Sequence, residues 1–403
     1  MDLSIQRLKL SKTDGSGEDR LSDLPDDVLI HILVLVDDTP AAARTSVLAS
    51  RWRRLWVLLP ELRFAFIEHH RIGAALTAHE APDLRLLFAL TKDASPESLS
   101  AWLPIAARGL SGAMYLQVGR REAETEAAER GTAIDLPCFE KAATIMLKLG
   151  FLGLALPPSG VFARLGDLQL VDIQLHGQSA LGDLLSSQRC PSLWCLLVRD
   201  VRGLDSLTIH SNSILRMELL DMRHLQQLTV MAPELKRLKV RNCFTDPLNP
   251  DLSVANISAP QLRSLNWKNV HDPSSIQLNK MMHLKRLGIQ LFILEGEEAF
   301  EHNQYCMTLL RRFERVCTLD LVIYYPQDIC TGQNLMEPMP RLPDITTLEL
   351  GVVAYGHSFG ASLFDILRKC SGVKELDLDF LPEDKLEVAS AICNQTGEWR
   401  SLR

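Results

Sequence analysis

The sequence predicts an α/β solenoid, in which a helical N-terminal segment precedes an irregular array of repeats whose strands form a curved parallel sheet. Two observations support this fold class. From about residue 139 the template L-x-x-L-x-L recurs nine times, and residues 19–59 hold two apolar helical stretches separated by a short break. A chain of 403 residues is too long for one ordinary compact domain and suits a small domain followed by an elongated array.

Composition narrows the class of protein further. A hydrophobic content of 46% is enough to form a sizeable buried core. A net charge of −7 shows no overall excess of basic residues of the kind that binds nucleic acid. The nine cysteines are odd in number and none has C-x-x-C spacing, and no secretory signal or membrane-spanning run occurs. We therefore expect reduced thiols and a protein of the nucleus or cytoplasm, with no membrane partner.

The first helix of the N-terminal segment is expected to begin at Pro25, after a flexible tail at residues 1–18. Proline is tolerated in the first turn, and the acidic pair that follows suits the positive end of the helix dipole. The chain Asp37–Pro40 should end this helix, because the residue before a proline avoids helical geometry. Five apolar side chains then share one face of the helix, namely Val28, Leu29, Ile32, Leu33 and Val36.

A second helix is expected from about Ala41. Its apolar face would hold Val47, Leu48, Trp52, Leu55 and Trp56, with arginines beside them. About 40 residues cannot bury this much apolar surface alone, so the segment must pack on the rest of the chain or on a partner. A helical hairpin that caps the following core and a docking module for another protein both satisfy this requirement.

The sequence of this segment resembles a known module. L-S-D-L-P-D-D-V-L-I-H-I-L followed by A-A-R-T-S-V-L-A-S-R-W-R-R-L-W is similar to the F-box of plant F-box/leucine-rich-repeat proteins, and Ala49-Ser50 is the one departure. The resemblance places the F-box at residues 19–62 and implies binding to the Skp-type adaptor of a cullin–RING ubiquitin ligase. The residues that it marks for the adaptor contact or for the F-box core are Leu24, Pro25, Val28, Leu29, Ile32, Leu33, Val47, Leu48, Trp52, Leu55 and Trp56.

The next stretch is interpreted as the opening of the array, which would occupy residues 63–403. It is expected to hold a short strand around Phe64 and Phe66, and a further strand at Leu110–Val118. Residues 119–136 are highly charged and predict a solvated insertion loop, with a regulatory loop as the alternative. The helices expected in this stretch are Arg71–Ala78, Asp83–Leu90 and Pro96–Arg108.

The nine templates define the array. Successive copies start 28, 21, 21, 27, 22, 32, 29 and 28 residues apart, mostly in or near the leucine-rich-repeat range. Each copy predicts one strand whose inward side chains are buried only when neighbours stack. The templates are Leu165/Leu168/Leu170, Leu193/Leu196/Val198, Ile214/Met217/Leu219, Leu235/Leu238/Val240, Leu262/Leu265/Trp267, Leu284/Leu287/Ile289, Val316/Leu319/Leu321, Ile345/Leu348/Leu350 and Val373/Leu376/Leu378.

Shorter patterns lie between these strands. Leu204/Leu207/Ile209 and Leu225/Leu228/Val230 follow a main strand too closely for a helix, which predicts a second short strand on the convex face. Helices are expected at Glu297–Phe313 and Phe359–Lys369, where the units are longer. Many relatives carry a C-terminal FBD module, and Leu381–Arg403 is too short to hold one.

No motif of the common enzyme classes occurs, so we expect a non-catalytic protein. His302-x-x-x-Cys306 lacks a second ligand pair, and no metal site is predicted. Basic residues on the concave surface hold an inositol phosphate in hormone-receptor relatives. The spacing of Lys236, Arg237, Lys239 and Arg241 is not specific enough to imply this, so these are read as solvated strand positions and no cofactor is predicted.

The resemblance, which extends to about residue 380, implies a specific function. The chain would be the substrate-recognition subunit of an SCF-type (Skp–cullin–F-box) E3 ubiquitin ligase, with adaptor and cullin as partners and an unknown target protein on the repeats. Two alternatives stay open at this point. The chain could be an F-box interaction protein that acts outside a ligase, or a ligand-sensing receptor within one.

Overall fold

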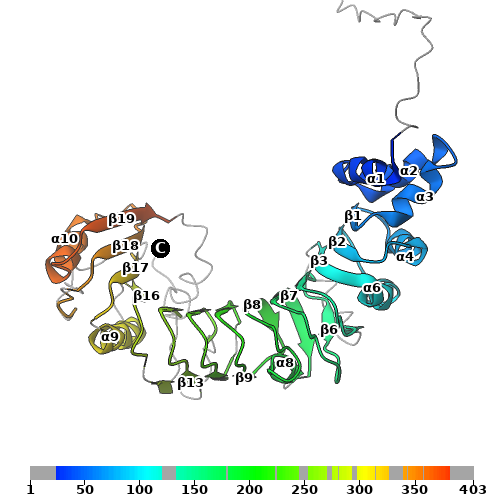
Figure 1. The fold of residues 1–403 in the computed structure, drawn as a ribbon. Coiled ribbons are helices and arrows are strands. Elements are labelled where there is room, and N and C mark those ends of the chain that lie inside the picture. Colours follow the sequence, from blue (N-terminus) through cyan, green and yellow to red (C-terminus); the bar gives the residue numbers. More distant parts are fainter. Residues whose placement is uncertain are drawn as a thin grey trace, which may run out of the picture.

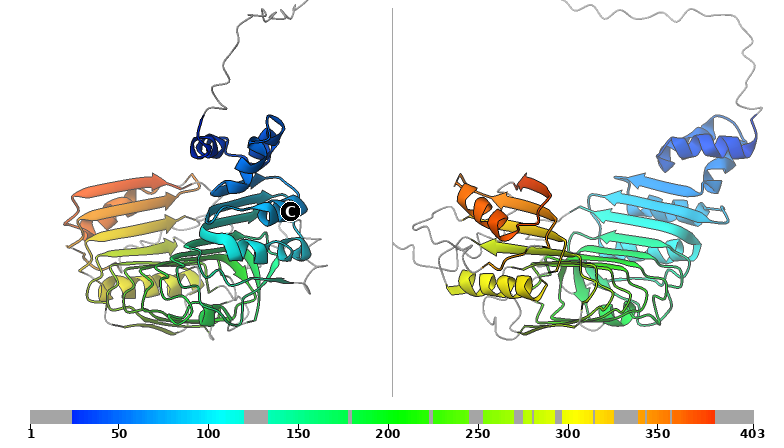
Figure 2. Two further views of the ribbon diagram at one scale, coloured as in Figure 1. Left: turned by 45° about the vertical axis from the view of Figure 1, so that its right-hand side comes forward. Right: turned by 60° about the vertical axis from the view of Figure 1, so that its left-hand side comes forward.

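A computed structural model describes residues 24–119, 133–177, 180–222, 225–244, 253–269, 275–279, 281–292, 297–313, 315–325, 339–342, 344–356 and 358–381. The chain forms an open horseshoe with the N-terminal helices at one end (Figure 1). One long parallel sheet lines the concave side, and helices and a smaller sheet cover the convex side (Figures 1 and 2). The predicted α/β solenoid is confirmed. The predicted tail at 1–18, most of the charged run at 119–136 and residues 382–403 lie outside the described residues.

The first helix, α1 (Asp26–Leu35), forms where the sequence predicts it. Pro25 has extended backbone and precedes the helix, and Asp26 and Asp27 lie in its first turn. Asp37 then takes a positive φ of 58°, a conformation that aspartate tolerates better than most residues, and the chain turns away.

The predicted second helix is wrong as a continuous element. The chain instead forms α2 (Thr39–Arg44), the 3₁₀ turn η1 (Thr45–Val47), α3 (Trp52–Leu55) and the 3₁₀ turn η2 (Trp56–Leu58). Asp38 caps α2 by accepting a hydrogen bond from the Ala41 amide at 3.1 Å, and the Thr45 hydroxyl donates to the Ala42 carbonyl at 2.6 Å. Such hydroxyl contacts and the β-branched residues of T-S-V favour a break over a regular helix. The break changes which side chains share a face.

The main sheet follows the order of the chain, and every strand pair in it is parallel. Its short side strands are β4 (Ala133–Asp135) and β6 (Gly153–Ala155). The strands along the main path are β1 (Glu61–Ala65), β2 (Leu84–Thr91), β3 (Leu110–Val118), β5 (Thr144–Lys148), β7 (Asp167–His176), β8 (Cys195–Arg202), β10 (Arg216–Leu220), β12 (Arg237–Arg241), β14 (Ser264–Lys268), β16 (Arg286–Phe292), β17 (Thr318–Tyr324), β18 (Thr347–Val353) and β19 (Glu375–Phe380).

All nine leucine templates contribute a strand to this sheet. Their second and third positions form two rows that run from strand to strand in register, as in Leu168↔Leu196 and Leu170↔Val198. These rows are buried from β7 to β18, and the residues between them face the concave side. The periodicity of two along each strand therefore separates a core face from an exposed face.

The predicted helix at Asp83–Leu90 is wrong, because this stretch forms strand β2. Leu84 and Leu87 are three residues apart, a spacing that suits a helix as well as the repeat template. Strand pairing decides in favour of the repeat template, because β2 is hydrogen-bonded to β1 on one side and to β3 on the other. The strand predicted at Leu110–Val118 is confirmed as β3.

The second sheet confirms the short convex strands. Its order is β15 (Ser275–Leu278), β13 (Val254–Ser258), β11 (Gln227–Met231) and β9 (Ser206–His210), all parallel. The two patterns predicted from sequence correspond to β9 and β11. In these units the core is therefore a layer between two sheets instead of between a sheet and helices (Figure 1).

Helices cover the convex side at both ends of the array (Figure 1). The expected helix Pro96–Arg108 is split, because Pro104 has no amide hydrogen to continue the ladder and so begins a new helix. The helices expected at 71–78, 297–313 and 359–369 are confirmed within a few residues. The helices are α4 (His69–Ala78), α5 (Pro96–Ser100), α6 (Leu103–Gly109), α8 (Ala180–Leu184), α9 (Glu297–Arg312) and α10 (Gly360–Lys369).

One position in successive repeats has left-handed backbone. Asp172, Asp200, Asp221 and Asn242 lie two residues after the third position of the leucine template, and their φ values lie between 50° and 55°. Aspartate and asparagine adopt this conformation more readily than other non-glycine residues. The Asn242 Nδ2 also donates to the Asp221 Oδ1 of the preceding strand at 2.9 Å. Strands β10 and β12 end just before this position, whereas β7 and β8 continue past it.

Replacing Asn242 with valine should lower the free energy of unfolding by about 2 kcal/mol, because a β-branched residue resists positive φ and the bond to Asp221 is lost. Urea denaturation of the full chain measures the change. Asn242→Gly keeps the backbone conformation and removes only the hydrogen bond, so it should cost about 1 kcal/mol. Equal stability of the two variants would contradict a conformational role for this position.

The N-terminal helices and the array share one core. Leu29, Leu33 and Leu55 belong to the same continuous cluster of buried residues as the strands. The backbone amide of Arg63 in β1 donates to the buried hydroxyl of Thr39 at 2.7 Å, which fixes α2 to the first strand. Among the described residues, none of the helices has the length and hydropathy that a transmembrane span requires.

Candidate interaction surfaces

Helix α1 carries two adjacent apolar stripes. Leu29 and Leu33 form the inner stripe and are almost completely buried. Val28, Ile32 and Val36 are spaced four residues apart, so they form a neighbouring stripe that is exposed or half-buried. The sequence predicts one continuous face, and the structure shows that the core covers only half of it.

Val47 and Leu48 project from the break between α2 and α3. Their side chains are 85% and 67% exposed, whereas Trp52 and Leu55 in the next helix are buried. A continuous helix would have placed all four on one face, and the 3₁₀ turn separates them instead. Two large apolar side chains are thus left in water beside a compact core.

The predicted contact residues therefore divide into three groups. Leu35 was not among the predicted residues and is 70% exposed. It lies seven residues after Val28 and therefore near the same side of α1. In order, Leu29, Leu33, Trp52 and Leu55 are buried, Leu24, Ile32 and Trp56 are half-buried, and Pro25, Val28, Val47 and Leu48 are exposed.

Ion pairs tie the short helices to one another. Arg51 bonds Asp26 at the start of α1 at 2.6 Å, and Arg63 of β1 pairs with Asp37 at 3.0 Å. Both pairs lie at the surface, where a single pair contributes at most about 1 kcal/mol. They connect the start of α1 to the residue before α3, and the segment after α1 to β1.

The concave face of the main sheet changes character along its length. One register row of half-buried residues runs from apolar side chains to a basic one. It joins Phe88, Tyr115, Met146, Gln169, Leu197, Glu218 and Lys239. Strands β12 to β16 place mainly cations on this face, and β17 to β19 place carboxylates there, including Asp320, Glu349 and Asp377.

Ion pairs on this face pass over an intervening strand. Lys268 of β14 reaches Asp320 of β17 at 2.7 Å, and Asn266 donates to the same carboxylate at 2.9 Å. Gly288 of β16 lies between them, and a Cβ there would stand 2.5 Å from the Asn266 Nδ2. Arg286 likewise forms an ion pair with Glu349, two strands away. The glycine leaves room for a contact that no sequence pattern indicates.

Four of the seven cysteines that the structure describes are buried in the core, and Cys317 is exposed. Burial raises the pKa of Cys190 and Cys243 to about 12, and that of Cys370 to about 11. These thiols are protonated at neutral pH and poorly suited to nucleophilic attack. Within the described part of the chain, His, Cys, Asp and Glu side chains do not gather in a group of three that could hold a metal ion.

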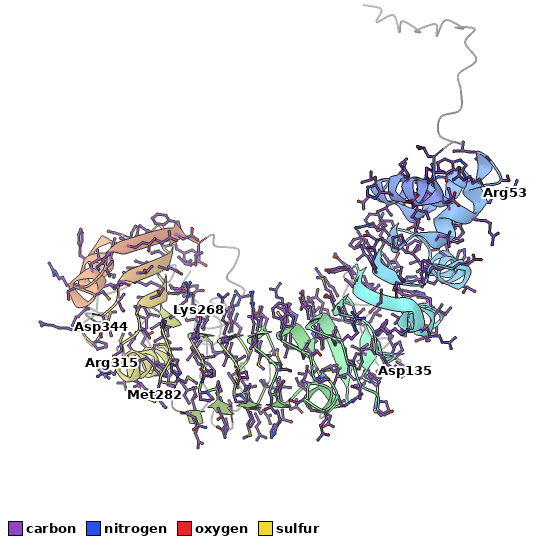
Figure 3. All side chains as sticks on the ribbon, in the orientation of Figure 1. Arg53, Asp135, Lys268, Met282, Arg315 and Asp344 are labelled. Atoms are coloured by element: carbon purple, nitrogen blue, oxygen red, sulfur yellow. The ribbon has the colours of Figure 1, made fainter. Side chains whose placement is uncertain are left out.

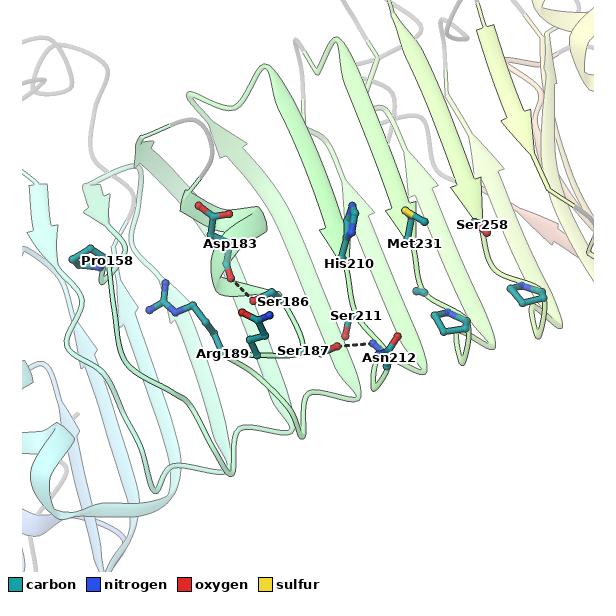
Figure 4. A pocket seen from close by; sticks show the side chains of 14 residues that line it. Pro158, Asp183, Ser186, Ser187, Arg189, His210, Ser211, Asn212, Met231 and Ser258 are labelled. Carbon is teal, nitrogen blue, oxygen red and sulfur yellow. Dashed lines mark hydrogen bonds between the residues drawn. The ribbon is translucent and has the colours of Figure 1, made fainter.

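A hollow of about 960 Å³ lies on the flank where the convex strands end (Figure 4). His210, Met231 and Ser258 occupy one register row of the second sheet beside it. The Arg189 guanidinium in its wall donates to backbone carbonyls of Pro157, Ser159 and Gly160. This arginine therefore has a structural partner set and fixes the loop before β7.

Comparison with known proteins places these surfaces in context. A family model described as FBD-associated F-box protein At5g56370, LRR repeats, matches residues 125–321. Three similar proteins come from Arabidopsis thaliana. The putative F-box/FBD/LRR-repeat protein At4g03220 is 26% identical over 68% of this chain and 56% of its own length, and the putative F-box/LRR-repeat protein At4g15060 is 26% identical over 76% of this chain and 75% of its own length. The putative F-box/FBD/LRR-repeat protein At3g49030 is 30% identical over 54% of this chain and 51% of its own length. The chain thus spans little more than half the length of two of these relatives.

Proposed function

Because the chain belongs to the F-box/leucine-rich-repeat proteins of plants, we propose that it is the substrate-recognition subunit of an SCF-type ubiquitin ligase. Residues 19–62 would form the F-box and bind the Skp-type adaptor, which links the chain to the cullin. The array would hold a target protein in the nucleus or cytoplasm. The chain itself would do no chemistry and would act by raising the effective concentration of target lysines near a conjugating enzyme.

The observation that carries the proposal is the density of exposed apolar residues in the N-terminal helices. Of the fourteen large apolar side chains exposed in the described part of the chain, five lie between residues 28 and 48. A cluster of this kind beside a buried core is typical of a surface that another protein covers. The five residues are Val28, Leu35, Val36, Val47 and Leu48.

The division of the apolar residues supports a rigid connection between adaptor and array. Leu29 and Leu55 pack into the core that continues into β1, while Val47 and Leu48 stay available for a partner. An adaptor bound to the outer residues would therefore be held in a fixed orientation relative to the concave face. A fixed orientation suits a receptor that must present its target to a conjugating enzyme.

Target turnover in plant cells tests the proposal. The chain carrying Val47→Glu and Leu48→Glu, fused to a proximity-labelling enzyme, should label proteins whose abundance falls when the unaltered chain is expressed. Proteasome inhibition should restore that abundance. Labelled proteins whose abundance does not respond to the unaltered chain would favour an interaction protein that acts outside a ligase.

A further inference from the structure

Three neighbouring strands concentrate positive charge on one part of the array. Residues 235–244, 262–269 and 284–292, which contain β12, β14 and β16, hold eight basic residues and not one aspartate or glutamate. The whole chain carries a net charge of −7, so this concentration departs from its average. We call these residues the basic strip: Lys236, Arg237, Lys239, Arg241, Arg263, Lys268, Lys285 and Arg286.

Part of the basic strip is neutralised within the protein. Lys268, Arg286 and Arg241 form ion pairs with Asp320, Glu349 and Asp221. Across the part of the chain that the structure describes, neither an ion pair nor a side-chain hydrogen bond holds Arg237 or Lys239. Both alternate with the buried Leu238 and Val240 on β12, which puts them on the concave face. Arg237 is exposed and therefore available to a ligand, and Lys239 is available in part, since it is half-buried and stands opposite Glu218 of β10.

The register places like charges directly opposite one another. Arg237 stands opposite Arg216 of β10, and Arg241 stands opposite Lys268 of β14. Cross-strand pairs of like charge destabilise a sheet. Burial lowers the pKa of Lys268, and Lys239 and Arg286 lower it further, against the opposing effect of Asp320. Glu218 pairs with Arg216, Asp221 with Arg241 and Asp320 with Lys268. The repulsion that an anionic partner would relieve is therefore concentrated at Arg237, which stands opposite Arg216.

The apolar part of the concave face lies one strand away from the basic strip, with Glu218 of β10 between them. Phe88, Tyr115, Met146 and Leu197 lie in one register row with Lys239, on β2, β3, β5 and β8. All four are half-buried and so offer part of their surface to a ligand. From β2 to β12 the row crosses six strand intervals, which span about 29 Å, the length of roughly nine residues of extended chain.

We propose that the concave face binds an extended protein segment, whose acidic residues lie on the basic strip and whose apolar residues lie on the row Phe88–Tyr115–Met146–Leu197. The segment would cross the strands of the sheet, with its acidic end over Arg237 and Lys239. A nucleic acid fits less well, because it needs cations along its whole length and half of this row is apolar. The inference rests on the proposed function only in identifying this segment as part of the ubiquitination target.

Selection of binding peptides tests the inference directly. The full chain, immobilised, is used to select from a display library of random peptides of about sixteen residues. Selected peptides should be enriched in aspartate and glutamate, and their affinity in fluorescence anisotropy should fall as salt rises from about 0.05 to about 0.2 M. Sequences without acidic enrichment, or tighter binding of a mixed-sequence DNA duplex, would overturn it.

Charge reversal separates a ligand site from a structural role. Arg237→Glu combined with Lys239→Glu should weaken binding of the selected peptides by at least about tenfold. Thermal stability should stay close to that of the unaltered chain, because Arg216 then faces a carboxylate at position 237 while Glu218 faces one at position 239. Arg108→Glu on the convex helix α6 is the matched control and should bind like the unaltered chain. Unchanged peptide affinity in the double variant would overturn the inference.

The same samples distinguish this inference from the proposed function. Adaptor binding depends on the N-terminal helices, so both charge-reversal variants should bind the adaptor as the unaltered chain does. A chain that selects acidic peptides but never binds the adaptor would contradict the ligase proposal alone. A chain that binds the adaptor but selects no acidic peptides would contradict the acidic-segment inference alone.

Discussion

Replacing Val47 and Leu48 together with glutamate is expected to abolish binding of the Skp-type adaptor. Both side chains are largely exposed, so they contribute little to the core and much to any surface that covers them. Burial of one large aliphatic side chain contributes about 1.5–3 kcal/mol, and a carboxylate in an apolar interface adds a desolvation cost. The combined loss should exceed about 3 kcal/mol, which weakens the dissociation constant by more than about 100-fold.

Two controls make the result specific to this surface. Met282→Glu introduces the same charge at an apolar side chain that is 84% exposed in the array, far from the N-terminal helices (Figure 3), and it should leave adaptor binding unchanged. Calorimetric titration of the purified chain with recombinant adaptor measures the affinity, and a thermal melt verifies folding. Adaptor binding that survives the double substitution in a folded protein would show that Val47 and Leu48 lie outside the interface.

The second large effect concerns the core of the array. Trp267→Ala should lower the free energy of unfolding by about 3–5 kcal/mol, because it removes the largest kind of side chain from a closed position. Trp267 is only 1% exposed on β14, and its ring stacks on Phe244 with centroids 5.9 Å apart. Trp194→Ala removes the same side chain from an exposed site and should cost less than about 1 kcal/mol.

A solenoid should confine the damage from Trp267→Ala. Each repeat touches mainly its neighbours, so hydrogen exchange should accelerate first in β12, β14 and β16 and least in the N-terminal helices. Urea denaturation gives the overall loss, and exchange measured by mass spectrometry gives its location. The variant should still bind the adaptor. Equal costs for Trp267→Ala and Trp194→Ala would contradict the assignment of Trp267 to the core.

The inward face of the array was the most predictable part of the fold. A leucine or valine at fixed spacing needs a buried position, and stacked strands provide one at every repeat. The opening units were harder to predict, because smaller or aromatic residues replace leucine in their templates. Leu84/Leu87/Ala89 of β2 and Ala142/Ile145/Leu147 of β5 follow the same spacing with alanine at one position, and all six residues are buried.

The left-handed position after each template shows a related limit. The pair Asn242-Cys243 matches the Asn/Cys position that follows a leucine-rich strand, and the aspartates equivalent to Asn242 follow no such pattern. Asp172, Asp200 and Asp221 occupy the same place and adopt the same positive φ. Their equivalence lies in the backbone conformation that both residue types tolerate, and it becomes visible once the strands are in register.

The residues of the candidate interaction surfaces could be predicted, but which of them are exposed and which are buried could not. Neighbouring stripes of α1 differ by one residue in sequence, and only packing shows that Leu29 faces the core while Val28 does not. The same holds for the concave face. Lys268 and Asp320 are 52 residues apart, and they meet because the curved sheet brings β14 and β17 together over a glycine.

The central claim is that the chain connects a target to a cullin through its N-terminal helices. Affinity purification of the full chain from plant cells, followed by quantification of both Skp-type adaptor and cullin, tests it most directly. We predict that both subunits co-purify with the unaltered chain and that Val47→Glu with Leu48→Glu removes both together. Recovery of the adaptor without the cullin would contradict the claim and assign the chain to a complex outside the ligase.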